Sequence, residues 1–253
     1  MGLIGEDLKG KCVVVTGATG GVGAAVAKTL AECGAKVLAV DLNDDKLNAL
    51  VTSLPGSGHA SRSLDLGNLD QHGPLFARAQ DMGEFVALAH CAAVLRRRDS
   101  VDLVTEDDWD FQIDTNLKAT FFLNRAARDS MKAKGTKGSI VNFTSQGWWT
   151  GGFGGSVVYA ASKGGIVSMT RGLARSFAAE GIRVNAVSPG GVDTAMLTDG
   201  QTSEAMAAFI SMIPLGRLAE PAEIAQSVLF LASNNSSYIT GAVINISGGQ
   251  LMY

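Results

Sequence analysis

The chain has 253 residues, of which 46% are hydrophobic and 18% charged, so it can bury a sizeable apolar core. Its net charge of −3 gives no general attraction to nucleic acid, and no run of about 18 uncharged apolar residues indicates a membrane span. We therefore expect neither a nucleic-acid partner nor a membrane partner.

Three cysteines and three histidines are dispersed along the chain. The spacing of Cys12, Cys33 and Cys91 fits neither a disulfide framework nor a metal-binding cluster, so we expect no protein-built metal site. Unpaired thiols are typical of a reducing compartment, and the N-terminus carries acidic residues without an apolar stretch. We therefore expect a cytoplasmic protein.

Short apolar runs alternate with stretches of helical length. The pattern predicts strands at residues 11–17, 35–41, 59–65, 84–90, 138–145, 182–190 and 242–249. It predicts helices at residues 21–34, 43–54, 69–80, 109–122, 157–179 and 221–233, the second of them capped by Asn43. Continuously apolar strands separated by helices are typical of a parallel sheet that is covered on both faces.

These elements predict an α/β fold, a doubly wound seven-stranded parallel sheet with helices on both faces, in a single domain over residues 1–253. Residues from about 194 to 214 lie between the sixth predicted strand and the last helix and carry several methionines. We predict that this insertion forms a small helical lid over a site.

A glycine-rich loop at residues 16–23 follows the first predicted strand and opens the first helix. Glycines at positions 17, 21 and 23 allow a tight turn and a close approach to a pyrophosphate, toward which the helix N-terminus directs its free N–H groups. A strand before such a loop and a helix after it make dinucleotide binding the favoured interpretation over a plain turn.

Two acidic residues end predicted strands on the same side. Asp41 follows the second strand, where a carboxylate accepts from the ribose hydroxyls and repels a 2′-phosphate, so NAD(H) is favoured over NADP(H). The alternative is that Asp41 caps the next helix. Asp65 ends the third strand, either facing an adenine amino group or serving as a turn residue.

Tyr159 and Lys163 are four residues apart in a predicted helix, so they share one helix face. A nearby cation lowers the pKa of a phenol, which would make Tyr159 a general acid–base near neutral pH. Ser145, upstream at the end of a predicted strand, is a candidate donor to a substrate oxygen. The Tyr–Lys pair alone is more often a solvated helix face.

In combination these features resemble the short-chain dehydrogenase/reductase family, in its NAD-preferring form of roughly 250 residues. The resemblance rests on the glycine loop, Asp65, Asn116, Ser145, Tyr159, Lys163, residues 185–190, Thr194 and residues 247–249. It implies a Rossmann fold, hydride transfer through a nicotinamide cofactor and a homotetramer.

The resemblance also implies a role for each catalytic residue. Tyr159 would transfer a proton, and Ser145 would position the substrate oxygen. Lys163 would hold the nicotinamide ribose and lower the pKa of Tyr159, while Asn116 would hold a water in a proton relay. The cofactor-binding residues would be Gly17, Thr19, Gly20, Gly21, Val22, Gly23, Asp41, Leu42, Asp65, Leu66, His90, Cys91, Ala92, Tyr159, Lys163, Pro189, Gly190, Val192 and Thr194.

The chain departs from the family after the fourth predicted strand. Where the family usually has Asn-Asn-Ala-Gly, this chain has His90, Cys91, Ala92 and Ala93. Ala93 restricts backbone angles that glycine would allow, and His90 would have to replace the contacts of the first Asn. Cys91 is either a buried inert thiol or a redox-sensitive one.

The substrate side carries adjacent aromatic residues among glycines. The predicted substrate-binding residues are Ser145, Gln146, Trp148, Trp149, Phe153, Tyr159 and Met196. They indicate a partly apolar substrate that contains a ring, unless the tryptophans pack at a subunit contact. Residues 96–98 are three arginines that either pair with a substrate anion or form a solvated basic turn.

The leading hypothesis is an NAD(H)-dependent oxidoreductase that interconverts a secondary alcohol and a carbonyl compound. An alternative with the same catalytic residues is an NADPH-dependent 3-oxoacyl-acyl-carrier-protein reductase. A remote alternative is a dinucleotide-sensing scaffold without catalysis, since a fold does not fix a function.

Overall fold

The computed structural model describes residues 3–152 and 154–253. Seven parallel strands form one sheet in the order β3-β2-β1-β4-β5-β6-β7, which confirms the predicted doubly wound fold. The strands are β1 Cys12–Thr16, β2 Lys36–Asp41, β3 Ala60–Ser63, β4 Phe85–His90, β5 Ser139–Phe143, β6 Arg183–Pro189 and β7 Val243–Ile246. The strand order reverses between β1 and β4, where ligands bind in such sheets.

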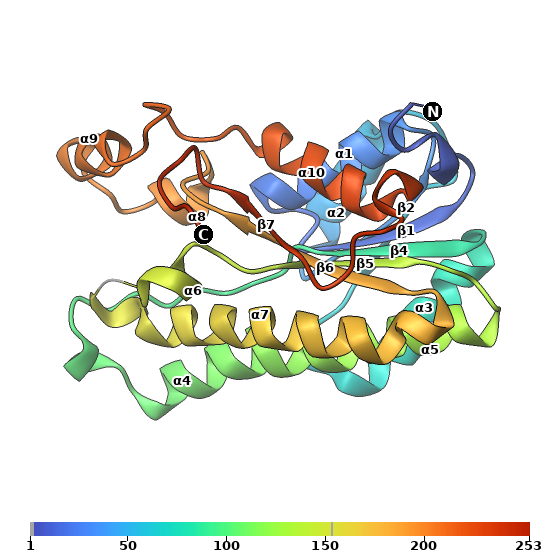
Figure 1. The fold of residues 1–253 in the computed structure, drawn as a ribbon, viewed down its shortest axis with the longest axis horizontal. Helices are drawn as coiled ribbons and strands as arrows, with labels where there is room; N and C mark the ends of the chain where they lie inside the picture. Colours follow the sequence, from blue (N-terminus) through green and yellow to red (C-terminus); the bar gives the residue numbers. More distant parts are fainter. Residues whose placement is uncertain (1–2, 153) are drawn as a thin grey trace.

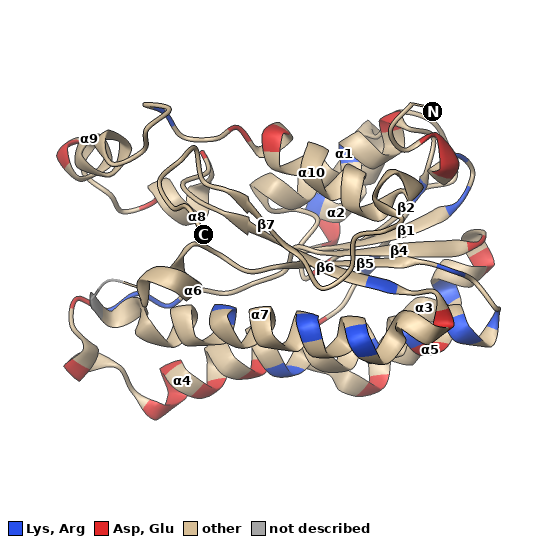
Figure 2. Ribbon diagram, viewed as in Figure 1, with Lys and Arg blue, Asp and Glu red and all other residues tan. Residues whose placement is uncertain are grey.

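Helices cover both faces of the sheet (Figure 1). One layer contains α1 Gly21–Glu32, α2 Asp44–Ser53 and α10 Pro221–Ala232, and the other contains α3 His72–Met82, α4 Glu106–Ile113, α5 Ala119–Ala133 and α7 Val157–Phe177. Figure 2 shows acidic residues along α4 and basic residues along the neighbouring α7. Charges therefore gather on the helices, while the apolar strands lie between the two layers.

Alternation along the strands divides the core into two halves. Val13 and Val15 of β1 pack into the half that contains α1 and α10. Cys12 and Val14 of the same strand pack into the half that contains α3 and α5. Successive side chains of a strand point to opposite faces, so a strand that is apolar throughout must be covered on both sides.

One predicted helix differs from the structure. The helix expected at residues 109–122 belongs to a longer segment, in which a π-helical turn at Asp114–Lys118 joins α4 to α5. The segment at residues 194–214 contains two short helices, α8 Ala195–Thr198 and α9 Ser203–Ser211. No helix in the described ranges is both long enough and apolar enough to cross a membrane.

Candidate active site

A cavity of about 350 Å³ opens beside the carboxyl ends of β1, β4, β5 and β6. The predicted site residues that line it are Gly17, Gly20, Gly21, Val22, Gly23, Cys91, Ser145, Gln146, Tyr159, Lys163, Pro189, Gly190, Val192, Thr194 and Met196. The structure thus brings the glycine loop and the predicted catalytic pair into one cavity. The predicted residues outside its lining are Thr19, Asp41, Leu42, Asp65, Leu66, His90, Ala92, Asn116, Trp148 and Trp149. Phe153 lies outside the described residues.

The glycine loop lines the cavity with backbone atoms, because its glycines have no side chains. Gly17 has a φ of +63°, and a Cβ there would lie 2.7 Å from the backbone of Ala92. A Cβ at Gly23 would lie 2.0 Å from the carbonyl oxygen of Gly17. Gly20 precedes α1 without a side-chain cap, so the first N–H groups of that helix are available to an anion. This cradle fits the pyrophosphate of a dinucleotide.

Asp41 connects the end of β2 to the glycine loop. Its carboxylate accepts from the N–H of Thr19 at 2.9 Å and from the N–H of Leu42 at 2.7 Å. Asn43 caps α2, as predicted, by accepting from the N–H of Lys46 at 2.9 Å. The helix-cap alternative for Asp41 is therefore wrong, and lone pairs of its carboxylate remain for ribose hydroxyls.

Asp65 and Leu66 lie in the turn that follows β3. The carboxylate of Asp65 accepts from the N–H of Gly67 at 2.8 Å, which is the turn role considered as its alternative. Leu66 is buried in the core half that contains α3 and α5, so its side chain is not free to meet a cofactor.

Tyr159, Lys163 and Ser145 meet at the centre of the cavity. Ser145 is close enough to the phenol of Tyr159 to lower its pKa. The Nζ atom of Lys163 lies 5.6 Å from the centre of the Tyr159 ring and donates to the carbonyl of Phe143 at 2.9 Å. The hydroxyl of Thr144 donates to the carbonyl of Lys163 at 2.7 Å, which fixes α7 against the end of β5.

Burial shifts the pKa of both ionisable groups. Lys163 is 2% exposed, and burial lowers the pKa of its ammonium to about 8. Burial raises the pKa of Tyr159 above its ordinary value, and Ser145 and the charge of Arg97 only partly offset this. The ammonium of Lys163 is bonded to the carbonyl of Phe143, and its effect on the pKa of Tyr159 stays a prediction.

Known proteins are similar to this chain over most of its length. A family model described as Enoyl-(Acyl carrier protein) reductase matches residues 17–250. A solved structure titled short chain dehydrogenase/reductase family protein superimposes with a TM-score of 0.84 at 35% identity, covering 95% of this chain and 97% of that one. The chain belongs to the short-chain dehydrogenase/reductase family. It is therefore an oxidoreductase that acts on hydroxyl and keto groups, with a nicotinamide dinucleotide as cofactor.

Two relatives illustrate the range of activities within the family. The protein "3-oxoacyl-[acyl-carrier-protein] reductase FabG" of Rickettsia prowazekii is 37% identical over 246 residues, which cover 97% of this chain and 99% of the relative. The "(3R)-3-hydroxyacyl-CoA dehydrogenase" of Homo sapiens is 34% identical over 261 residues, and 97% of each chain is covered. Both names describe oxidoreduction at a hydroxyl or keto carbon.

The departure from the family motif at His90 has a structural solution that lies away from the cofactor. The ring nitrogen Nδ1 lies 2.7 Å from the hydroxyl of Thr16, and Nε2 lies 2.8 Å from that of Thr120. Because Thr120 donates its proton to the carbonyl of Asn116 at 2.6 Å, Nε2 donates to Thr120 and Nδ1 accepts from Thr16. Burial lowers the pKa of His90 to about 3, so the ring is neutral. The expectation that His90 contacts the cofactor is therefore wrong.

Cys91 and Ala93 also differ from the usual family motif, and both fit the local structure. No non-glycine residue in the described ranges has a positive φ, so Ala93 adopts an ordinary backbone conformation. Cys91 is half-buried and lines the cavity, and burial raises the pKa of its thiol. A raised pKa disfavours the reactive thiolate, which is consistent with the inert alternative.

Asn116 uses its side chain to hold the protein together. Its Oδ1 accepts from the N–H of Val94 at 2.8 Å, and its Nδ2 donates to the carbonyl of Val94 at 2.9 Å and to the hydroxyl of Ser162 at 3.2 Å. Both ends of the amide therefore have protein partners, and the water-holding role expected from the resemblance stays a prediction. Asn116 fixes the segment after β4 against α7.

The two tryptophans pack on the C-terminus. The ring of Trp148 lies 5.0 Å from that of Tyr253, and the ring of Trp149 stacks on Tyr253 at 5.5 Å. Both belong to the short helix α6 Gly147–Thr150, and neither lines the cavity. The expectation that they form the substrate wall is wrong for this cavity, because both rings pack against Tyr253 outside its lining.

Other residues line the outer part of the cavity. Leu95, Arg97, Leu197 and Phe209 join the predicted Met196 there. Leu197 and Phe209 belong to the segment predicted as a lid, whereas Leu95 has no motif of its own. Arg97 was one of three adjacent arginines, and the sequence carries no signal that separates it from its neighbours.

Proposed function

We propose that this protein interconverts a secondary alcohol and a ketone, or a primary alcohol and an aldehyde, with NAD(H), using Tyr159 as the general acid–base. The observation that carries the proposal is that Ser145, Tyr159 and Lys163 line one cavity together with the glycine loop. This full set of groups counts against a scaffold without catalysis.

Each group has a task that follows from its position. In the reducing direction Tyr159 gives its proton to the carbonyl oxygen, and Ser145 donates a hydrogen bond that orients the same oxygen. Lys163, buried and charged, stabilises negative charge on the phenol and offers donors to a ribose hydroxyl. The nicotinamide, when bound, supplies or accepts the hydride.

Replacing Tyr159 with Phe tests this proposal. The change removes one oxygen, so turnover across a panel of carbonyl compounds should fall by about 10²–10⁴-fold. Stabilisation of the protein by NADH in a melting assay should persist, because the glycine loop is intact. Tyr238, which is 102% exposed, gives the matched control Tyr238→Phe with unchanged turnover. Undiminished turnover in Tyr159→Phe would refute the assignment.

The preference for NAD(H) rests on Asp41. Its carboxylate is held at the end of β2 by the N–H groups of Thr19 and Leu42, where it would repel a 2′-phosphate. NADH should therefore raise the melting temperature more than NADPH at equal concentration, and Asp41→Asn should narrow the difference.

The alternative is an NADPH-dependent 3-oxoacyl-acyl-carrier-protein reductase. The printed name of the Rickettsia prowazekii relative favours it. Stronger stabilisation by NADPH, together with faster reduction of a 3-oxoacyl thioester than of simple ketones, would establish this alternative in place of our proposal.

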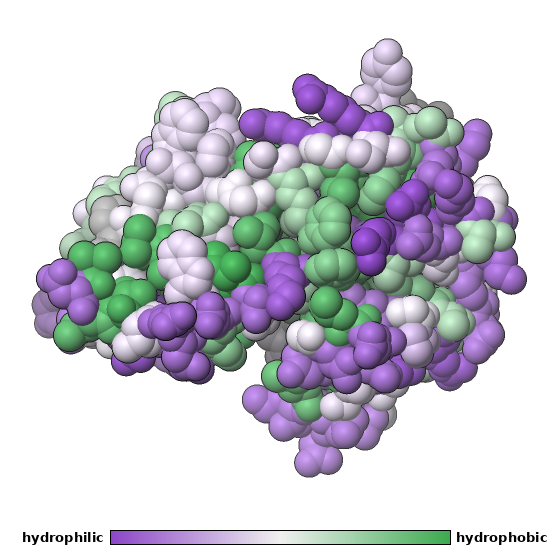
Figure 3. Space-filling view, turned by 90° about the horizontal axis from the view of Figure 1, so that it is seen from below, coloured by the Kyte–Doolittle hydropathy of each residue, from purple (hydrophilic) through white to green (hydrophobic). Residues whose placement is uncertain are grey.

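We also propose a homotetramer in the cytoplasm. Exposed apolar side chains lie on the helices that cover the lower face, among them Trp109, Phe121 and Val157. Figure 3 shows hydrophobic residues gathered at one end of this face. Such patches support association with another copy, and sedimentation equilibrium would measure the mass of the assembly. The three thiols are unpaired, which fits a reducing compartment.

A further inference from the structure

Two of the three adjacent arginines are neutralised by α4. Arg98 forms a two-point ion pair with Asp108, through bonds of 2.8 Å each. Arg96 pairs with Asp107, lies 3.5 Å from Asp108 and covers the ring of Phe111 at 3.9 Å. These two side chains therefore have a structural explanation that needs no ligand.

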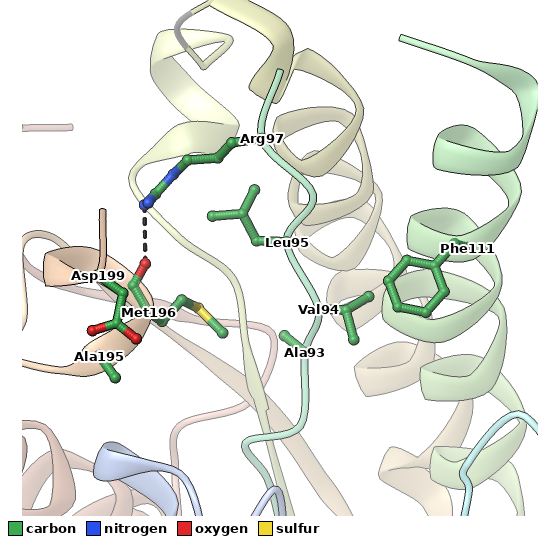
Figure 4. A pocket seen from close by; sticks show the side chains of 8 residues that line it. All are labelled: Ala93, Val94, Leu95, Arg97, Phe111, Ala195, Met196 and Asp199. Carbon is green, nitrogen blue, oxygen red and sulfur yellow. Dashed lines mark hydrogen bonds between the residues drawn. The ribbon is translucent and has the colours of Figure 1, made fainter. Parts of the chain in front are cut away.

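Arg97 is oriented differently. Its guanidinium donates to the carbonyl of Met196 at 3.0 Å, across the cavity mouth (Figure 4). Within the described ranges it forms no ion pair, although Asp199 lines the same outer cavity. One backbone carbonyl uses one of the five donors of a guanidinium, so most of its hydrogen-bonding capacity remains.

The position of Arg97 links the reacting centre to a second space. It lines the cavity that contains Tyr159 and also an adjoining cavity of about 580 Å³, whose other walls include Leu95, Phe111 and Met196. The positive charge of Arg97 reaches the phenol, since it lowers the pKa of Tyr159 against the effect of burial. No residue of the glycine loop lines the outer cavity, so this space lies beyond the dinucleotide cradle.

We propose that Arg97 binds an anionic group of the substrate, so that the protein acts on carbonyl compounds or alcohols bearing a carboxylate or phosphate close to the reacting carbon. A planar guanidinium matches both anions through two parallel hydrogen bonds. The charged residues that line the two cavities are Arg97, Lys163 and Asp199, and of these only Arg97 lines both. The inference rests on the proposed oxidoreductase function and names its substrate class.

Matched substrate pairs distinguish the two anions from each other and from neutral compounds. Acetoacetate is compared with its methyl ester, and dihydroxyacetone phosphate with dihydroxyacetone. The wild-type protein should prefer the charged member of at least one pair. In Arg97→Gln the kcat/KM for that member should fall by about 10- to 100-fold, as expected for hydrogen bonds to a charged group, while the neutral member changes little.

Two further variants separate recognition from structure. Arg97→Lys keeps the charge but loses the planar two-point geometry, so it should recover only part of the preference. Arg96→Gln makes the same chemical change one residue away, and it should affect the charged and neutral members equally. A binding arm needs no turnover: in the presence of NADH, acetoacetate or inorganic phosphate should raise the melting temperature of wild type but not of Arg97→Gln.

Two outcomes would overturn the inference. One is an equal loss for charged and neutral members in Arg97→Gln; the other is anion-induced stabilisation that is absent from wild type or unchanged in the variant. Turnover of the charged members that depends on Tyr159 but not on Arg97 would leave the proposed function standing and this inference refuted. Loss of the Tyr159 dependence would refute the proposed function itself.

Discussion

The buried charge of Lys163 should lower the stability of the folded protein. Burial brings the pKa of its ammonium from 10.5 to about 8, which corresponds to about 3 kcal/mol at 1.36 kcal/mol per pKa unit. Lys163→Met removes this charge and also the bond to the carbonyl of Phe143, whose loss costs about 1 kcal/mol. We therefore expect the variant to be more stable by about 2 kcal/mol at neutral pH, which raises the melting temperature by about 4–8 °C.

The pH dependence identifies the cause. Below pH 8 both the folded and unfolded protein hold this proton, so the cost is fully present in wild type. Between pH 8 and 10.5 the folded protein releases the proton while the unfolded chain keeps it, so the stability of wild type rises toward that of Lys163→Met. The melting temperatures of wild type and Lys163→Met, recorded without cofactor from pH 6.5 to 10, measure the difference in stability at each pH.

A matched control removes an exposed ammonium. Lys28 is exposed on α1. The difference in melting temperature between Lys28→Met and wild type should therefore not narrow between pH 8 and 10. The reasoning would be refuted if Lys163→Met were less stable than wild type at pH 7, or if its advantage were the same at every pH. Turnover by Lys163→Met should be reduced in either case, which separates its effect on folding from its role in the site.

Three further substitutions test individual contacts. Gly23→Ala places a methyl group 2.0 Å from the carbonyl oxygen of Gly17, so stabilisation by NADH in a melting titration should disappear while the fold persists in circular dichroism. His90→Leu leaves two buried threonine hydroxyls without their partner and should lower the free energy of unfolding in urea by about 2–4 kcal/mol. Asp108 has a pKa held below 3.8 by Arg98, so Asp108→Asn should melt earlier than wild type above pH 4. That difference should close as the pH falls further, because wild type then loses the same ion pair.

The fold could be predicted because its signals are local. Apolar runs such as Val13–Val15 require two covered faces, and Asn43 ends one element and begins the next through a contact three residues away. Gly17 and Gly23 are likewise required by the tight turn that they form. Each of these features depends on neighbours in the sequence, so its pattern remains visible without coordinates.

The substrate end of the site could not be predicted because its contacts join distant segments. Trp148 and Trp149 pack on Tyr253, and no local pattern brings a chain terminus onto that loop. Arg97 differs from Arg96 only in which side of the backbone faces α4. His90 finds its two threonines on different elements. Tertiary packing decides all these partners.

The cost of burying Lys163 and the acidity that Tyr159 needs have a common origin. In this structure the ammonium has a carbonyl for a partner, and the described residues provide no carboxylate for it. A buried cation without an anion is stabilised by any negative charge formed beside it, and the Tyr159 ring on the same helix face has its centre 5.6 Å from the Nζ atom of Lys163. Ionisation of Tyr159 should therefore be easier whenever Lys163 is charged and harder when it is not. On its alkaline side, the pH–rate profile should then report the ionisation of Tyr159 and Lys163 as a coupled pair. Lys163→Met should shift the pH at which the rate changes on that side and should also lower the maximal rate.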